Sequence, residues 1–186
     1  NGLKESAEMQ EAAQQLKQEL EGYGLRVVLA KEAADDVMGY YGKEGIMAKA
    51  YESHAKYYIE LGMNSSNETR YGGSEIYHSN YSSATLANAL MYGLKKNTAL
   101  TPSNVYTWSE HSEGVSSSLY AQGKDGKLVY DMMPALRESG GRISGAAEFS
   151  DAAKENESLI QNANSGMQSV SVNFIYLTNK GDVSTW

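Results

Sequence analysis

The sequence predicts an α/β domain whose sheet is twisted and mainly parallel, with helices on both of its faces. Two observations predict it. Segments with helical periodicity alternate along the chain with short apolar runs, and these runs are typical of strands buried in a parallel sheet. The length of 186 residues is enough for one sizeable core, so we expect a single domain over residues 1–186.

The first half of the chain predicts two helix-and-strand pairs. Apolar residues recur every three or four positions in the opening segment, which indicates an amphipathic helix that stops near Gly22 and Gly24. The apolar run at residues 25–29 then predicts a short buried strand. A helix over residues 44–54 and a strand at residues 57–61 follow.

The second half continues this alternation. The expected elements are a strand at 74–77, a helix from Ser82 or Ser83 to about Lys95, a looser region from 98 to 151 with an apolar patch at 128–130, a helix at 152–163 and a long central strand at 170–177. We expect Val27, Ile59, Ile76 and Val172 to lie buried on adjacent or nearly adjacent strands.

Charge and composition exclude several classes of partner and site. The net charge of -7, without a cluster of Lys and Arg, argues against a nucleic-acid partner. The absence of cysteine excludes disulfides and thiolate metal sites. No apolar run approaches the ~18 residues of a membrane span.

The imidazoles give no sign of a metal or catalytic motif. His54, His78 and His111 are the three histidines, and none forms an i, i+4 pair or an H-E-x-x-H motif. We expect His54 at a helix end and the other two on the solvated surface. A Ser-His-Asp triad stays an alternative, but no G-x-S-x-G elbow supports it. Composition and spacing alone therefore indicate a globular α/β domain.

Five stretches follow one another in the order and spacing of a known family. They are a G-x-x-E run at residues 2–5 that leads into the first helix and the apolar run at 25–29, a strand at 57–65, a G-x-E-x-Y motif at 73–77, a helix at 83–96 and a closing stretch at 174–179. Together they resemble the zinc-dependent N-acetylmuramoyl-L-alanine amidases (amidase type 3), which cut bacterial peptidoglycan.

The resemblance implies a zinc ion held by His, Glu and His, which activates water with help from a catalytic glutamate. Glu5 matches the ligand glutamate. The second ligand histidine falls on Gly62, and the catalytic glutamate falls on Asn173, whose amide accepts no proton at neutral pH. The first histidine belongs to a G-H-G-G segment that would precede Asn1. Because a lone glutamate cannot hold a catalytic zinc, we predict that this chain lacks the metal.

Other positions bear on the same site. The family's T-R pair is Ala30-Lys31 here. At the start of the next helix the family usually has an arginine, and this chain has Ile46. A structural alternative for Glu5 is a carboxylate that the helix dipole stabilises. Glu75 is interpreted as a structural or groove residue. The residues expected to contact substrate are Asn64, Glu75, Arg137 and Arg142. Residues 64–67 and 178–179 are expected to converge at the carboxyl edge of the sheet. The alternative for the two arginines is that they form ordinary surface ion pairs.

Three functional hypotheses stay open. The first is an impaired amidase domain retained for muropeptide binding or regulation. The second is an active zinc amidase that recruits another histidine and hydrolyses the amide between N-acetylmuramic acid and L-alanine. The third is a protein-interaction module on the amidase fold. The resemblance also implies a bacterial extracellular or cell-wall location, a domain that lacks the family's first strand and C-terminal helix, and a variable insertion at residues 98–150.

Overall fold

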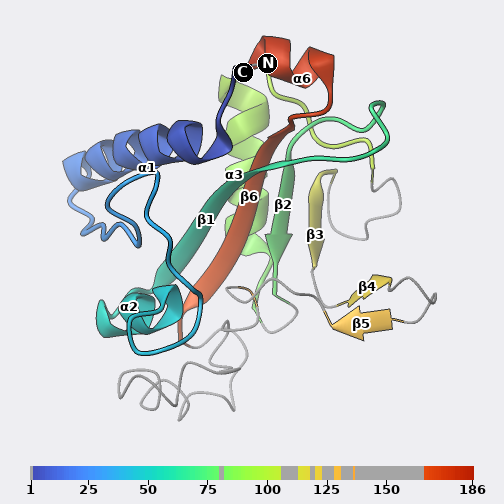
Figure 1. The fold of residues 1–186 in the computed structure, drawn as a ribbon. Coiled ribbons are helices and arrows are strands. Elements are labelled where there is room, and N and C mark those ends of the chain that lie inside the picture. The colour runs from blue at the N-terminus through green and yellow to red at the C-terminus, as the bar shows by residue number, and fades with distance from the viewer. Residues whose placement is uncertain are drawn as a thin grey trace.

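A four-stranded sheet forms the centre of the molecule (Figure 1). The computed structural model describes residues 2–79, 82–105, 113–117, 120–122, 128–130, 136 and 166–186. The strand order is β1 (Tyr57–Asn64), β6 (Gln168–Tyr176), β2 (Glu75–His78) and β3 (Val115–Ser117). β1 runs parallel to β6 and β2 parallel to β3, while β2 and β6 are antiparallel. The predicted α/β class with a mainly parallel sheet is thus confirmed.

Helices flank this sheet. They are α1 (Glu5–Gly22), α2 (Ile46–Glu52), α3 (Thr85–Asn97) and the short α6 (Lys180–Thr185). In Figure 1, α3 crosses behind the strands, α1 and α2 lie beside β1, and α6 lies at the end of the sheet where β1 and β6 finish. The helices predicted at the opening segment, at 44–54 and after Ser83 are confirmed. A further two-stranded antiparallel sheet joins β4 (Tyr120–Gln122) to β5 (Leu128–Tyr130).

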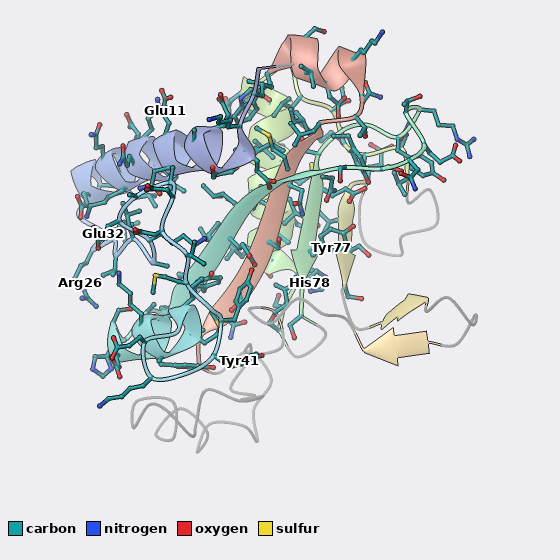
Figure 2. All side chains as sticks on the ribbon, viewed as in Figure 1. Glu11, Arg26, Glu32, Tyr41, Tyr77 and His78 are labelled. Atoms are coloured by element: carbon teal, nitrogen blue, oxygen red, sulfur yellow. The ribbon has the colours of Figure 1, made fainter. Side chains whose placement is uncertain are left out.

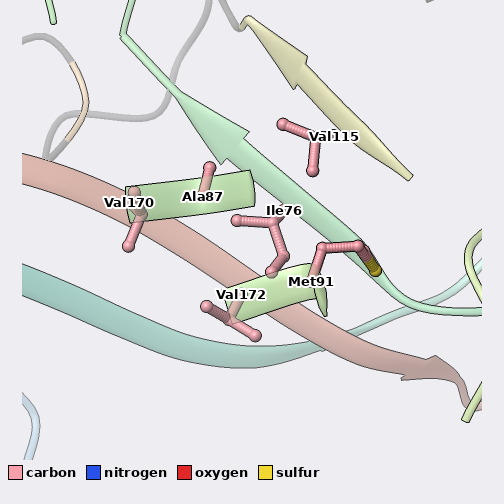
Figure 3. Close-up of a cluster of buried hydrophobic side chains, with 6 residues drawn as sticks. All are labelled: Ile76, Ala87, Met91, Val115, Val170 and Val172. Atoms are coloured by element: carbon pink, nitrogen blue, oxygen red, sulfur yellow. The ribbon is translucent and has the colours of Figure 1, made fainter. Parts of the chain in front are cut away.

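The main core lies between α3 and one face of the sheet. Ile76 of β2 and Val172 of β6 are buried against Ala87 and Met91 of α3 (Figure 3). Ile59 of β1 is partly buried at the same cluster. Burial of these branched side chains removes apolar surface from water, which stabilises the sheet and fixes its register. Three of the four residues predicted for adjacent strands therefore occupy them.

Over residues 169–173 the other face of β6 is polar, which is unusual for a strand buried on both faces. Ser169, Ser171 and Asn173 alternate with Val170 and Val172, and all five are buried. Because successive strand residues point to opposite faces, the three polar side chains lie together on the side away from α3. This period-two pattern places the polar residues in a row along the central strand.

The predicted strand at residues 25–29 is wrong. This segment has no strand assignment, and Leu25 and Val28 are exposed by 55% and 47%. Lys17 of α1 donates to the Val27 carbonyl, and Arg26 extends toward the end of α2, where it donates to the Ser53 carbonyl (Figure 2). A short apolar run becomes a strand only where a neighbouring strand pairs with it. No described strand pairs with this segment, so Val27 is not a strand residue of the sheet.

Several expectations fall outside the described residues. The helix predicted at 152–163 lies there, as do most of residues 98–150. Within the described part of the chain, no helix is both long enough and apolar enough to span a bilayer.

Candidate functional site

The three positions that carry the predicted chemistry come together at the carboxyl end of β1. Gly62 of β1 is the register partner of Asn173 of β6. Glu5, the first residue of α1, accepts a hydrogen bond from the Met63 amide at 2.8 Å. A Cβ atom built on Gly62 would lie 3.1 Å from Asn173 Oδ1 and 3.4 Å from Glu5 Oε1. Two side-chain oxygens therefore flank the position that a larger residue would occupy.

The backbone of β1 explains why Glu5 is held there. The carbonyls of Lys56 and Asn64 accept hydrogen bonds from residues at either end of β6. In an extended strand, backbone groups of alternate residues point to opposite edges. The Met63 amide therefore points away from β6, and the Glu5 carboxylate satisfies it in place of a neighbouring strand. The carboxylate also lies in the first turn of α1, where the helix dipole stabilises negative charge.

Glu75 ties the ends of three strands and a loop to one carboxylate. It is only 2% exposed and is the register partner of Asn173. Its oxygens accept four hydrogen bonds of 2.6–2.7 Å, from the side chains of Asn64, Tyr77, Ser103 and Tyr176. Four donors satisfy the lone pairs of a buried carboxylate, which compensates for its loss of water. The structure thus places Glu75 in a structural network, and Asn64 belongs to the same network.

The two polar stretches expected at the carboxyl edge do converge. The Ser66 amide donates to Thr178 Oγ1 at 3.0 Å. Asn179 Nδ2 donates to the carbonyls of Thr69 and Tyr71 at 3.2 and 3.1 Å. Asp182 Oδ2 accepts from the amides of Gly73 and Tyr176, both at 2.8 Å. These contacts fasten the loop after β1 to the end of β6 beside Glu5 and Asn173.

A second polar row crosses the sheet one step from Gly62. Glu60 of β1, Ser171 of β6 and Tyr77 of β2 are register partners. Burial raises the pKa of the Glu60 carboxyl above its usual range, and a hydrogen bond from the Tyr40 hydroxyl partly offsets that rise. Sequence reasoning missed this row. The signal was the alternation of Ser169 and Ser171 with the apolar Val170 and Val172.

The histidines lie elsewhere. His78 is buried on β2, so its expected place on the solvated surface is wrong, and its Nδ1 lies 2.9 Å from the Ser79 carbonyl (Figure 2). The polar neighbours in the sequence were a misleading signal, because the burial of His78 comes from tertiary packing. His54 follows α2 with a positive φ of 53°. His111, Arg137 and Arg142 lie outside the described residues.

The residues present do not fit a catalytic zinc. At the position between Glu5 and Asn173, Gly62 contributes no ligand, and an amide oxygen is a poor zinc ligand beside the usual His, Cys and carboxylate. Among the described residues, no group of three or more His, Cys, Asp or Glu side chains is placed to hold a metal ion. The absence of zinc from this protein stays a prediction.

Comparison with known proteins identifies the family. A family model described as N-acetylmuramoyl-L-alanine amidase matches residues 1–124, more than half of the sequence. The chain belongs to this amidase family. The resemblance carried by the five sequence stretches is confirmed at this level.

Two solved structures share the amidase fold of this chain. The catalytic domain of CwlV, an N-acetylmuramoyl-L-alanine amidase from Bacillus (Paenibacillus) polymyxa var. colistinus, has a TM-score of 0.53 at 16% identity, over 92% of this chain and 67% of that one. Cwp6 from Clostridium difficile gives 0.53 at 14% identity, over 90% of this chain and 20% of that one. These low identities bear on the fold alone. The comparison with curated proteins gave no match.

Proposed function

We propose that this chain is a peptidoglycan-directed amidase domain that binds muropeptides and does not hydrolyse them. One observation carries the proposal. Glu5, Gly62 and Asn173 meet at one point, as the family's site requires, but two of the three lack the chemical group that the reaction uses. The three positions still lie side by side, while the metal ligand and the base that would activate water are missing from Gly62 and Asn173.

The chemistry of the replacements supports impaired catalysis. Amide hydrolysis needs an activated water and a base that takes its proton. The amide of Asn173 cannot act as that base, and Gly62 cannot hold a metal. The Glu75 carboxylate, on the register partner of Asn173, accepts four hydrogen bonds and so is poorly placed to take over as the base.

Binding of a muropeptide is supported by the polar edge of the sheet. In open α/β sheets, ligands lie at the carboxyl ends of the strands. Here that edge carries Glu5, Asn173 and the loop that Thr178 and Asn179 fasten. Arg137 and Arg142 remain proposed contacts for stem-peptide carboxylates. A cell-wall ligand places the proposed site of action outside the bacterial cytoplasm.

The test uses purified protein and purified peptidoglycan sacculi. We expect the protein to sediment with the sacculi and to release no soluble stem peptide, with or without added zinc. Asn173→Glu alone should leave release undetectable, although a general base contributes about 10²–10⁴-fold where the rest of a site is intact. Release of stem peptide by the unchanged protein would refute the impaired state. Failure to sediment with sacculi would refute the binding role.

A further inference from the structure

An open hollow lies beside α3, the helix that packs on the face of the sheet away from the Asn173 side chain. Its volume of about 440 Å³ is within the ~300–1,000 Å³ usual for small-ligand sites. We propose that this hollow binds an acidic N-acetylated sugar, with the sugar ring on Tyr92 and the acid group beside Lys96. The inference goes beyond the proposed function, because it gives the chain a second ligand site away from Gly62. The lining residues are Asn88, Met91, Tyr92, Lys95, Lys96 and Glu113.

The charge of α3 favours an anion. Its only charged residues are Lys95 and Lys96, whereas the chain as a whole has a net charge of -7. Lys95 pairs with Glu113 at 3.3 Å, so the lining keeps one positive charge beyond that pair. Lys96 Nζ lies 5.7 Å from the centre of the Tyr92 ring. A ligand that carries one acid group next to a ring therefore meets both side chains at once.

The aromatic side chain in the lining suits a sugar ring. Tyr92 is 65% exposed, and its place within a helix fixes the position of the ring. A pyranose has faces made of C–H groups, which pack on an aromatic ring, and hydroxyl groups at its edge, which stay in water. Met91 is the buried apolar part of the lining and matches the methyl of an N-acetyl group.

The shape of the site favours a sugar over a protein segment. An extended peptide binds largely through main-chain hydrogen bonds, but the backbone of a helix such as α3 is already hydrogen-bonded to itself. A docked helix needs apolar anchors over two or more turns. Met91 is the one buried apolar side chain of this lining. A single ring with one acid group therefore matches the hollow better than either kind of peptide.

An NMR titration of the isotope-labelled protein at low salt tests the site directly. The ligands are N-acetylmuramic acid, its methyl ester, N-acetylglucosaminuronic acid and the neutral N-acetylglucosamine. The two acids are separate sources of the same chemistry, and the ester and the neutral sugar lack the charge. We expect at least one acid to bind about three- to fivefold more tightly than its uncharged counterpart, as for an exposed ion pair. The amide signals that shift should be those of residues 88–96 and 113–115.

Matched variants locate the two contacts. Lys96→Gln should remove the preference for the acid, and Tyr92→Ala should weaken binding of charged and neutral sugars alike. Lys56→Gln and Tyr57→Ala are the controls, because Lys56 Nζ lies 5.5 Å from the centre of the Tyr57 ring but neither residue lines the hollow. They should leave affinity unchanged, and a melting curve checks that every variant folds.

Three results would overturn the inference. One is equal affinity for acidic and uncharged sugars, and another is the absence of shifts along α3. The third is binding of N-acetylglutamate, which has the acid and acetyl groups but no ring, as tightly as the acidic sugars. That result would assign the hollow to an acidic peptide instead.

Discussion

Replacement of the buried Glu75 by leucine tests whether one carboxylate holds the carboxyl edge of the sheet together. The side chain is 2% exposed and accepts hydrogen bonds from Asn64, Tyr77, Ser103 and Tyr176. Leucine removes all four acceptor contacts and leaves the donors facing an apolar side chain. A buried donor left without a partner costs about 1–3 kcal/mol.

The four costs do not simply add. The hydroxyl hydrogens can rotate and water can enter, and single substitutions rarely exceed about 4–5 kcal/mol. We therefore expect Glu75→Leu to lower the free energy of unfolding by about 4 kcal/mol, a large part of the 5–15 kcal/mol typical of a domain. Glu75→Gln keeps one acceptor oxygen, and about 2 kcal/mol is expected. Tyr176→Phe removes a single hydroxyl, which corresponds to about 1 kcal/mol.

Urea unfolding followed by circular dichroism measures these differences, provided that the slope with denaturant is the same for every variant. For a chain of this size, 4 kcal/mol corresponds to a fall in Tm of roughly 8–16 °C. If Glu75→Leu unfolds within about 1 kcal/mol of the parent, the network is not a stabilising one and the reasoning is wrong. The expected order, leucine worse than glutamine and glutamine worse than Tyr176→Phe, must also hold.

Two further changes test burial and backbone geometry. Burial raises the pKa of Glu60 in the folded state, so the folded state holds this proton more tightly than the unfolded state. Stability therefore falls as pH rises above the ordinary pKa of 4.5. Glu60→Gln should raise Tm at pH 7 and leave Tm unchanged well below pH 4.5. Gly73 has a φ of 93°, and a Cβ there would lie 2.5 Å from the Pro102 carbonyl oxygen, so Gly73→Ala should cost at least about 2–3 kcal/mol. Gly24→Ala is its control, with a φ of 82° and open space, and should cost about 1 kcal/mol.

Periodicity in the sequence predicted the elements that pack against the core. It predicted the helices α1, α2 and α3 and the strands β1, β2 and β6. The spacing of apolar residues indicates directly which face of each element is buried. The convergence of residues 64–67 with 178–179 also followed, since strands that end at one edge bring their loops together. Gly62 and Asn173 meet as register partners on neighbouring strands, and Glu5 joins them through the hydrogen bond that it accepts from the Met63 amide.

Other features depend on partners that local sequence does not reveal. Residues 25–29 have the composition of a strand, yet no described strand pairs with them, and Lys17 and Arg26 fix the segment instead. Likewise, His78 stands among polar residues but is buried, because its surroundings come from tertiary packing. The four-donor network around Glu75 joins residues up to 101 positions apart, which no local pattern encodes.

The contacts at the carboxyl edge hold the ends of the strands together through protein groups. Glu75 binds side chains from β1, β2 and β6, and Asp182 binds the amides of Gly73 and Tyr176. Both carboxylates are satisfied by protein donors, so the strand ends do not rely on a shared ion for their position. The loss of a ligand that we propose at Gly62 would therefore remove chemistry and leave the geometry. A side chain at Gly62 would in turn need the Asn173 side chain to shift slightly, because a Cβ there would lie 3.1 Å from Asn173 Oδ1.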